Sequence, residues 1–418
     1  MTKLHFRKAG MVKEALVSFF LVLAATSPLS AEDGSRLYGR IWTTDGEKFD
    51  GYIQWDKNEV NWVDILNGTK QIPADRHKSS RKNRSDKYSF IRFPGFDVFS
   101  SDHGKSSTSG IRMGHIQSLV PTGRNSALLI LKSGAEIKFR GGATDIGTSN
   151  RGITVESDKN GELTLEWREI EKVEFMPSPE TPDSRQAQRI HGTLTTRDGN
   201  TFKGYVCWDI DEVFERDILD GNNGRRRMKI KFGNIAYIER IGSRATFVRL
   251  KSGREYKLSG TNDVNSGNRG ILISDPGFGQ VEVAWRNFKN LTFNEDYPAI
   301  TYADFDGGRR LSGTVYTEDN EEFSGMIHWD KDEAYTWEFL NGWHDDGKLA
   351  IEFGLIQEIN KVSSRTSNVH LRDGRHFQLR GSNDVNRENR GIVVEQNDGN
   401  VIIIDWSEFQ RVEFAKSP

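Results

Sequence analysis

Cysteine is almost absent from this sequence, because its 418 residues include one Cys, Cys207. A single thiol excludes an internal disulfide, so buried apolar surface must stabilise the fold. Long apolar runs are equally scarce. The run Ala15–Ala25 is shorter than the about 20 residues that a membrane-spanning helix needs. We therefore expect the remainder of the chain to contain no transmembrane segment.

Motifs that carry catalysis are also missing. The nine His residues show no metal-ligand spacing, and the chain has no nucleophile elbow, phosphate loop or dinucleotide fingerprint. Cys207 occupies a position that related segments fill with Gln54 and His328, which does not indicate a nucleophile. The sequence predicts a protein without catalytic residues, cofactor or bound metal.

The sequence also has no large excess of positive or negative charge. Lys and Arg number 58 against 60 Asp and Glu, which gives a formal net charge of −2. Such a balance argues against attraction of the whole surface to nucleic acid or anionic lipid. No nucleic-acid partner is expected.

The N-terminus has the parts of a secretory signal peptide. Lys3, Arg7, Lys8 and Lys13 precede the run Ala15–Ala25, which is followed by TSPLSA and then EDG. A basic head, a short apolar stretch and small residues are typical of such a peptide. We expect residues 1–31 to be removed and the product to be periplasmic or secreted.

Internal repetition is the dominant feature of the sequence after residue 31. GRIWTTDGEKFDGYIQWDKNE at Gly39–Glu59 matches GTLTTRDGNTFKGYVCWDIDE at Gly192–Glu212 and GTVYTEDNEEFSGMIHWDKDE at Gly313–Glu333. The pattern defines three repeats. Their expected bounds are repeat 1 at 36–176 with a basic insertion at about 72–110, a linker at 177–188, repeat 2 at 189–296, a junction at 297–308 and repeat 3 at 309–418.

Each repeat reads as two similar halves built of strands. Apolar residues alternate around DG and SG turns, which is typical of β-hairpins. Apolar residues at three-residue spacing in Ile230–Ile238 and Ile351–Ile359 indicate a single helical turn between strands. We predict an all-β protein of three tandem repeats, each a pair of small five-stranded barrels. A six-bladed β-propeller is the alternative.

Over most of the chain after the expected signal peptide, the pattern resembles the Sm-like and SH3-like small barrels, as repeat 2 shows. SGREYKLSG at Ser252–Gly260 is followed by Asp263-x-Asn265 and by a late strand, turn and strand. In Sm proteins an Asp/Asn loop and a later Arg-Gly contact RNA bases. Here Arg269-Gly270 precedes the middle strand, and export separates the chain from RNA, so the resemblance implies the fold and not RNA recognition.

A polar loop occurs three times, as TDIGTSNRG, NDVNSGNRG and NDVNRENRG. In each copy an Asp precedes an Arg by six residues, a spacing that predicts an ion pair bracing the loop. Three copies in one chain favour bracing, and a ligand-binding loop is the alternative. The residues concerned are Asp145 and Arg151, Asp263, Asn265 and Arg269, and Asp384, Asn386 and Arg390.

The loops W-D-x-x-E begin like a calcium loop but lack its turn Gly and bidentate Glu. We expect solvated turns at Trp55–Glu59, Trp208–Glu212 and Trp329–Glu333, with a calcium site of another type as the alternative. Six Trp residues at matching positions are expected to be core anchors, with an exposed stacking row as the alternative. They are Trp55, Trp208, Trp329, Trp167, Trp285 and Trp406.

Basic residues are concentrated in two stretches. In RHKSSRKNRSDK, within the insertion, Arg76, Lys78, Arg81, Lys82 and Arg84 are predicted to dock an acidic protein or an anionic glycan. A solvated loop is the alternative. In RRRMKIK at Arg225–Lys231 the alternation indicates a strand edge with one charged face.

Export, tandem β repeats and the lack of a catalytic motif favour one function. We expect a non-catalytic binding or scaffold protein of a bacterial cell envelope, with a protein or glycan as its partner. The alternative is a carbohydrate-processing hydrolase that uses carboxylates in an inter-domain cleft.

Overall fold

The structure is a computed structural model that describes residues 34–71, 89–92, 106–141, 144–157, 161–178, 188–293, 297 and 299–416. The expected signal peptide and the basic residues Arg76, Lys78, Arg81, Lys82 and Arg84 lie outside the described residues. Within the described ranges, no helix has the length and apolar character needed to cross a membrane.

The prediction of an all-β protein is confirmed. Every regular element of the described residues is a strand or a three-residue 3-10 turn. The expected single helical turns occur at Phe232–Asn234 and Phe353–Leu355, each between two strands, and repeat 1 has a further one at Met113–His115.

The strands follow the sequence repeats. Repeat 1 contains β1 (Tyr38–Thr43), β2 (Lys48–Trp55), β3 (Ile65–Gln71), β4 (Ser89–Arg92), β5 (Ser106–Arg112), β6 (Ile116–Gly123), β7 (Ser126–Leu131), β8 (Glu136–Arg140), β9 (Ile153–Ser157), β10 (Gly161–Leu165) and β11 (Ile170–Phe175). Repeat 2 contains β12 (His191–Thr196), β13 (Thr201–Trp208), β14 (Ile218–Asn223), β15 (Arg226–Lys231), β16 (Ile235–Ile241), β17 (Ala245–Leu250), β18 (Glu255–Ser259), β19 (Ile271–Asp275), β20 (Gly279–Val283) and β21 (Phe288–Phe293). Repeat 3 contains β22 (Ser312–Thr317), β23 (Glu322–His328), β24 (Phe339–His344), β25 (Gly347–Glu352), β26 (Ile356–Lys361), β27 (Thr366–Leu371), β28 (His376–Arg380), β29 (Ile392–Glu395), β30 (Asn400–Ile404) and β31 (Phe409–Phe414).

The three sets of strands pair in one order. In repeat 1 the order is β10-β9-β2-β1-β11-β6-β7-β8-β3-β5. In repeat 2 the antiparallel pairings run β20-β19-β13-β12-β21-β16-β17-β18-β14-β15. In repeat 3 they run β30-β29-β23-β22-β31-β26-β27-β28-β24-β25.

This order corrects two expectations. The described strands close no five-stranded barrel and form no separate propeller blades, because the two halves of each repeat exchange strands. In repeat 2, β19 and β20 from the second half pair onto β13, while β14 and β15 from the first half follow β18. Neither half can therefore complete its sheet without the other.

Small residues permit the tight packing at the centre of each repeat. A Cβ on Gly51 would lie 2.2 Å from the carbonyl oxygen of Glu156, and one on Gly325 would lie 2.1 Å from that of Glu395. Only glycine allows so close an approach of two strands. The six repeated Trp residues are all buried, which confirms them as core anchors.

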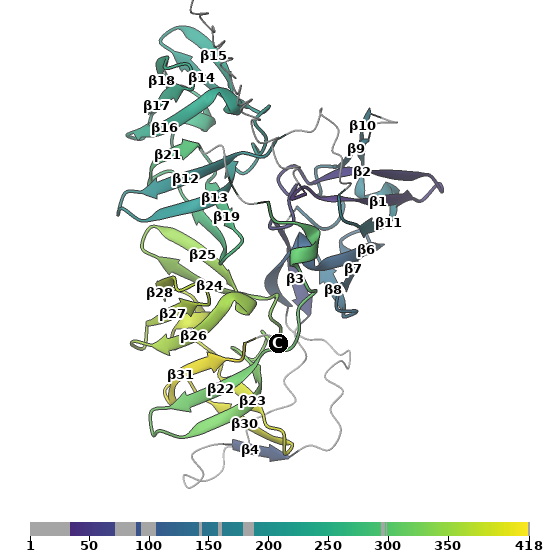
Figure 1. The fold of residues 1–418 in the computed structure, drawn as a ribbon, viewed down its shortest axis with the longest axis vertical. Helices are drawn as coiled ribbons and strands as arrows, with labels where there is room; N and C mark the ends of the chain where they lie inside the picture. The colour runs from purple at the N-terminus through teal and green to yellow at the C-terminus, as the bar shows by residue number, and fades with distance from the viewer. Residues whose placement is uncertain are drawn as a thin grey trace, which may run out of the picture.

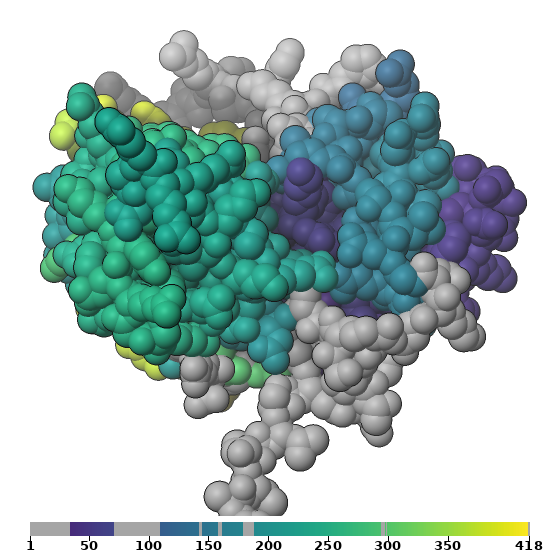
Figure 2. Space-filling model, turned by 90° about the horizontal axis from the view of Figure 1, so that it is seen from above, coloured from purple at the N-terminus to yellow at the C-terminus, as the bar shows by residue number. Residues whose placement is uncertain are grey.

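Repeats 2 and 3 form one column, and repeat 1 lies beside it (Figure 1). The column is continuous because β20 of repeat 2 pairs with β25 of repeat 3. At one end of the column β15 carries no further strand among the described residues, and at the other end β4 of repeat 1 pairs with β30. Figure 2 looks along the column and shows repeat 2 next to repeat 1.

The insertion in repeat 1 is shorter than its expected range of about 72–110. Strand β5 begins at Ser106 and pairs with β3 as β15 pairs with β14 in repeat 2. Residues from Ser106 onward therefore belong to the common strand pattern.

The junction at 297–308 packs on repeat 1, since the Tyr302 hydroxyl donates to the carbonyl oxygen of Ile116 at 3.0 Å.

Candidate functional site

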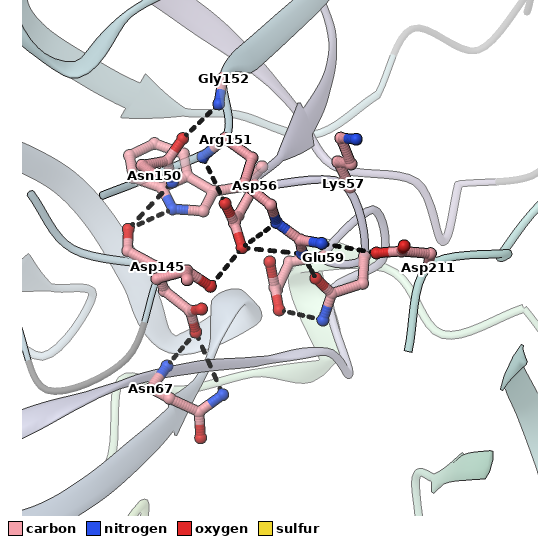
Figure 3. A network of polar contacts seen from close by, with 12 residues as sticks. Asp56, Lys57, Glu59, Asn67, Asp145, Asn150, Arg151, Gly152 and Asp211 are labelled. Carbon is pink, nitrogen blue, oxygen red and sulfur yellow. Dashed lines mark hydrogen bonds and ion pairs between the residues drawn. The ribbon is translucent and has the colours of Figure 1, made fainter. Parts of the chain in front are cut away.

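The repeated polar loop closes over the turn that follows β2. Asp56 is fully buried in that turn and has a left-handed φ of 53°. One of its oxygens accepts from the backbone N–H of Arg151 at 2.6 Å, and the other accepts from the Nη2 of Arg151 at 2.9 Å. We call this Asp–Arg pair the polar clasp (Figure 3). An ion pair reinforced by a backbone hydrogen bond in this way holds two loops in one geometry.

The clasp occurs in every repeat. Asp209 accepts from the backbone N–H of Arg269 at 2.5 Å and from its Nη2 at 3.1 Å. Asp330 accepts from the Nη2 of Arg390 at 2.7 Å and also from its backbone N–H. Both Asp residues are fully buried and, like Asp56, have left-handed φ angles. Because such angles strain non-glycine residues, the clasp compensates for the strain of the turn.

This geometry corrects the predicted ion pair within the polar loop. Each Arg pairs with the Asp that follows the buried Trp, and the Asp six residues before the Arg has another role. Asp145 accepts from the backbone N–H of Asn67 at 2.6 Å, Asp263 from that of Asp220 at 2.7 Å, and Asp384 from that of Asn341 at 2.6 Å. The loop is thus braced against the strand that follows the W-D-x-x-E turn.

Further hydrogen bonds tie the polar loop to the buried Trp and brace the loop internally. The indole N–H of Trp55 donates to the carbonyl oxygen of Asp145 at 2.8 Å, and Trp208 and Trp329 repeat the contact with Asp263 and Asp384. Asn265 accepts from the backbone N–H of Gly267 at 2.7 Å, and Asn386 accepts from that of Glu388 at 2.7 Å.

The expected solvated turns are wrong, because their carboxylates are largely buried. Glu59 is 2% exposed, and its Oε2 is buried without a hydrogen-bond partner in the described residues. The corresponding atoms of Glu212 and Glu333 share this condition. Burial raises the pKa of Glu59 well above its ordinary value, and the charges of Asp145, Asp64 and Asp56 raise it further.

These carboxylates are the residues that could hold a metal ion. Oxygens of Asp56, Glu59 and Asp145 lie within 4.8 Å of one another, as do those of Asp330, Asp332 and Glu333. Asp56, however, already accepts from the Arg151 guanidinium and from the Thr144 hydroxyl. The guanidinium supplies the positive charge that a cation would bring. The arrangement therefore favours a protonated Glu59 over a metal centre.

The clasps also join the repeats. Asp211 of repeat 2 accepts from Arg151 of repeat 1 at 2.5 Å (Figure 3). It also accepts from Arg269 of its own repeat at 2.5 Å. A second link is buried, since Arg189 of repeat 2 donates to Asp64 of repeat 1 at 3.0 Å. Arg151, predicted from the sequence as a candidate binding residue, thus holds one repeat against another.

Two depressions lie between repeats. A cavity of about 690 Å³ lies where all three repeats meet, and Asp145, Arg151 and Asp384 are among the residues that line it. A groove of about 780 Å³ lies between repeats 2 and 3, and Asn386 lines it. The linings of these two depressions do not include Asp263, Asn265, Arg269 or Arg390. The polar loops of repeats 1 and 3 thus meet at the cavity, and the polar loops of repeats 1 and 2 share Asp211 as an acceptor.

The lining of the groove was not predicted from the sequence. Its basic side chains are Arg286 from repeat 2 and three from repeat 3, namely Arg365, Arg380 and Arg387. They belong to different turns and strands, so no local motif marks them. Comparison with protein-family models, with curated proteins and with solved structures found no match.

Proposed function

We propose that the chain is an exported, non-catalytic binding protein of a bacterial cell envelope, and that it binds an acidic glycan in the groove between repeats 2 and 3. The observation that carries the proposal is the lining of this groove. Four exposed arginines and the half-buried Trp343 face one groove of about 780 Å³.

The walls of the groove are fixed by contacts between the two repeats. Asn200 donates to a carboxylate oxygen of Asp345 at 3.0 Å, and Asn287 donates to the carbonyl oxygen of Asp346 at 2.8 Å. Pairing of β20 with β25 holds the same two repeats together. A preformed groove loses little conformational freedom when a ligand binds.

The side chains suit a sugar chain that carries carboxylates. A guanidinium binds a carboxylate with two parallel N–H donors, and an aromatic ring stacks on the apolar face of a sugar ring. Asp345, Asp346 and Glu388 also line the groove and can accept from sugar hydroxyls. The polar loops complement this site because they stiffen the framework around it.

Binding can be tested with alginate oligomers as the acidic probe and dextran as the neutral one. We expect saturable, salt-sensitive binding of alginate by calorimetry and no binding of dextran. The double variant Arg365→Glu and Arg387→Glu should weaken alginate binding by roughly tenfold or more. Trp343→Ala should weaken it without changing the salt dependence.

A matched control places the same charge changes elsewhere. Arg254→Glu with Lys257→Glu alters two exposed residues that do not line the groove. If this control weakens binding as much as the groove variant does, the attraction is a property of the whole surface and the proposed site is wrong.

The rival function is a carbohydrate-processing hydrolase, and the cavity between the three repeats is where it would act. Glu282 of repeat 2 and Glu333 of repeat 3 both line this cavity. Hydrolysis of an oligosaccharide that is abolished by Glu282→Gln or Glu333→Gln would establish the enzyme. Turnover that persists in both variants would indicate a contaminating activity.

A further inference from the structure

Strand β15 is an open sheet edge at one end of the column (Figure 1). In the described residues it pairs only with β14. Its residues Arg226, Arg227, Lys229 and Lys231 are exposed, and Met228 between them is half-buried. An open edge presents unpaired backbone donors and acceptors to any strand of suitable chemistry.

The chain already contains a pairing that shows what such an edge accepts. Strand β25 is the counterpart of β15 in repeat 3, because each pairs with the strand before it and each precedes a 3-10 turn. β25 pairs antiparallel with β20 of repeat 2, with Val281 opposite Leu349 and Glu282 opposite Lys348. An apolar pair and a pair of opposite charges thus occupy consecutive positions of this ladder.

Strand β10 is the counterpart of β20 in repeat 1. Both follow the strand after the polar loop, and both begin at a glycine with positive φ, Gly161 and Gly279. In the described residues β10 pairs only with β9. Glu162 and Thr164 of β10 are exposed, and Leu163 between them is half-buried.

We propose that β10 of one copy of this chain pairs with β15 of a second copy, in the register of the β20–β25 pairing. That register places Leu163 opposite Met228 and Glu162 opposite Lys229. The apolar pair of the internal interface is reproduced, and a pair of opposite charges takes the place of Gln280 and Ala350. Cross-strand pairs of these kinds stabilise antiparallel sheets.

The two edges lie on different repeats, so the association is head to tail. Each copy offers one β10 edge and one β15 edge, and a contact between unlike surfaces builds open chains or closed rings. This inference goes beyond the glycan site and does not depend on it, because the groove lies between repeats 2 and 3 and neither edge strand lines it.

A rival edge-to-edge contact would use β30, the counterpart of β20 in repeat 3. That edge is covered by β4, and its sequence NVIII has no acidic residue to face the basic β15. The complementary charge of Glu162 favours β10. The experiments described next distinguish pairing of β15 with β10 from pairing of β15 with β30.

Sedimentation velocity of the full mature chain should show species larger than the monomer as concentration rises. Glu162→Lys and Lys229→Glu should each weaken association by roughly tenfold, because each places like charges opposite one another. The double variant, which exchanges the two charges, should restore it. Glu171→Lys makes the same charge change at an exposed residue of β11 and should have no effect.

Cross-linking tests the register directly. Leu163→Cys and Met228→Cys on separate molecules should form a mixed disulfide on oxidation, since opposite residues of paired strands lie within reach. Asn223→Cys in place of Met228→Cys should not, and the native Cys207 is buried. A wild-type chain that stays monomeric, or cross-linking equal to the Asn223 control, would overturn the proposal. If Glu162→Lys leaves self-association unchanged and deletion of residues 89–92 increases it, the chains associate through β30 instead of β10.

Discussion

Arg112 of repeat 1 forms a buried ion pair with Glu352 of repeat 3, with 3.1 Å between Nε and Oε2. The same guanidinium donates to the carbonyl oxygens of Asp275 and Pro276 in repeat 2, both at 3.0 Å. A planar group with five donors can bind several acceptors at once, which an ammonium cannot do in this geometry. One side chain therefore fixes the relative positions of all three repeats.

Arg112→Met should destabilise the protein by about 3–5 kcal/mol, because it leaves the buried Glu352 without its strongest partner. The double variant Arg112→Met and Glu352→Leu should recover most of this loss, since no charge then remains buried. Urea unfolding measures both. A single variant that is as stable as the double one would show that Glu352 does not depend on Arg112.

Removing a polar clasp should act locally. Arg269→Met leaves the fully buried Asp209 without its guanidinium, and we expect a loss of about 1–3 kcal/mol in the free energy of unfolding. Arg269→Lys should recover part of it, because lysine keeps the positive charge beside Asp209 but lacks the planar guanidinium that contacts Asp209 and Asp211 together. Arg244→Met, at an exposed site of the same repeat, is the control and should change stability by less than about 0.5 kcal/mol.

The fold class followed from the sequence because strand periodicity and turn residues are local properties. The hairpins and the 3-10 turn at Phe232–Asn234 occur where the pattern predicts them, and RRRMKIK forms the expected charged edge strand as β15. The exchange of strands between halves was not predictable. Pairing of β13 with β19 joins segments far apart in the chain, and the alternation in either strand fits several partners.

The candidate site was predictable in its residue types but not in its contacts. The polar loop was correctly expected to brace the fold, yet the partner of Arg151 is Asp56 and not Asp145. Both acids repeat in register with the Arg, so spacing alone cannot choose between them. Burial determines which Asp pairs with Arg151, because Asp56 is fully buried in a turn that was expected to be solvated.

The basic segment of the insertion remains a prediction about partner binding. Arg81→Ser, Lys82→Ser and Arg84→Ser together should weaken binding to an acidic partner and should flatten its salt dependence. Polyglutamate is a suitable probe, and sedimentation at several salt concentrations is a suitable measurement. The control changes three exposed basic residues of repeat 2, Arg254, Lys257 and Lys289, to Ser. Equal losses in both variants would remove any special role for the segment.

Glu212 should make stability depend on pH. Burial, with the charges of Asp263, Asp209 and Asp211, raises the pKa of Glu212 from its ordinary value of 4.5 to about 9. The Glu212 carboxyl therefore loses its proton near pH 4.5 in the unfolded chain, while in the folded chain it keeps the proton up to about pH 9. Between the two the folded state binds more protons, so the free energy of unfolding falls as pH rises, by up to about 1.4 kcal/mol per pH unit.

Glu212→Gln tests this expectation, because glutamine keeps the size of the side chain and cannot ionise. Urea unfolding of both proteins at several pH values between about 5 and about 9 should give a smaller fall for the variant, which should become the more stable protein at the alkaline end. Glu255→Gln, at an exposed site, should leave the profile unchanged. Parallel profiles for wild type and Glu212→Gln would mean that Glu212 is ionised in the folded protein, and the neutral-acid account of the three W-D-x-x-E turns would then be wrong.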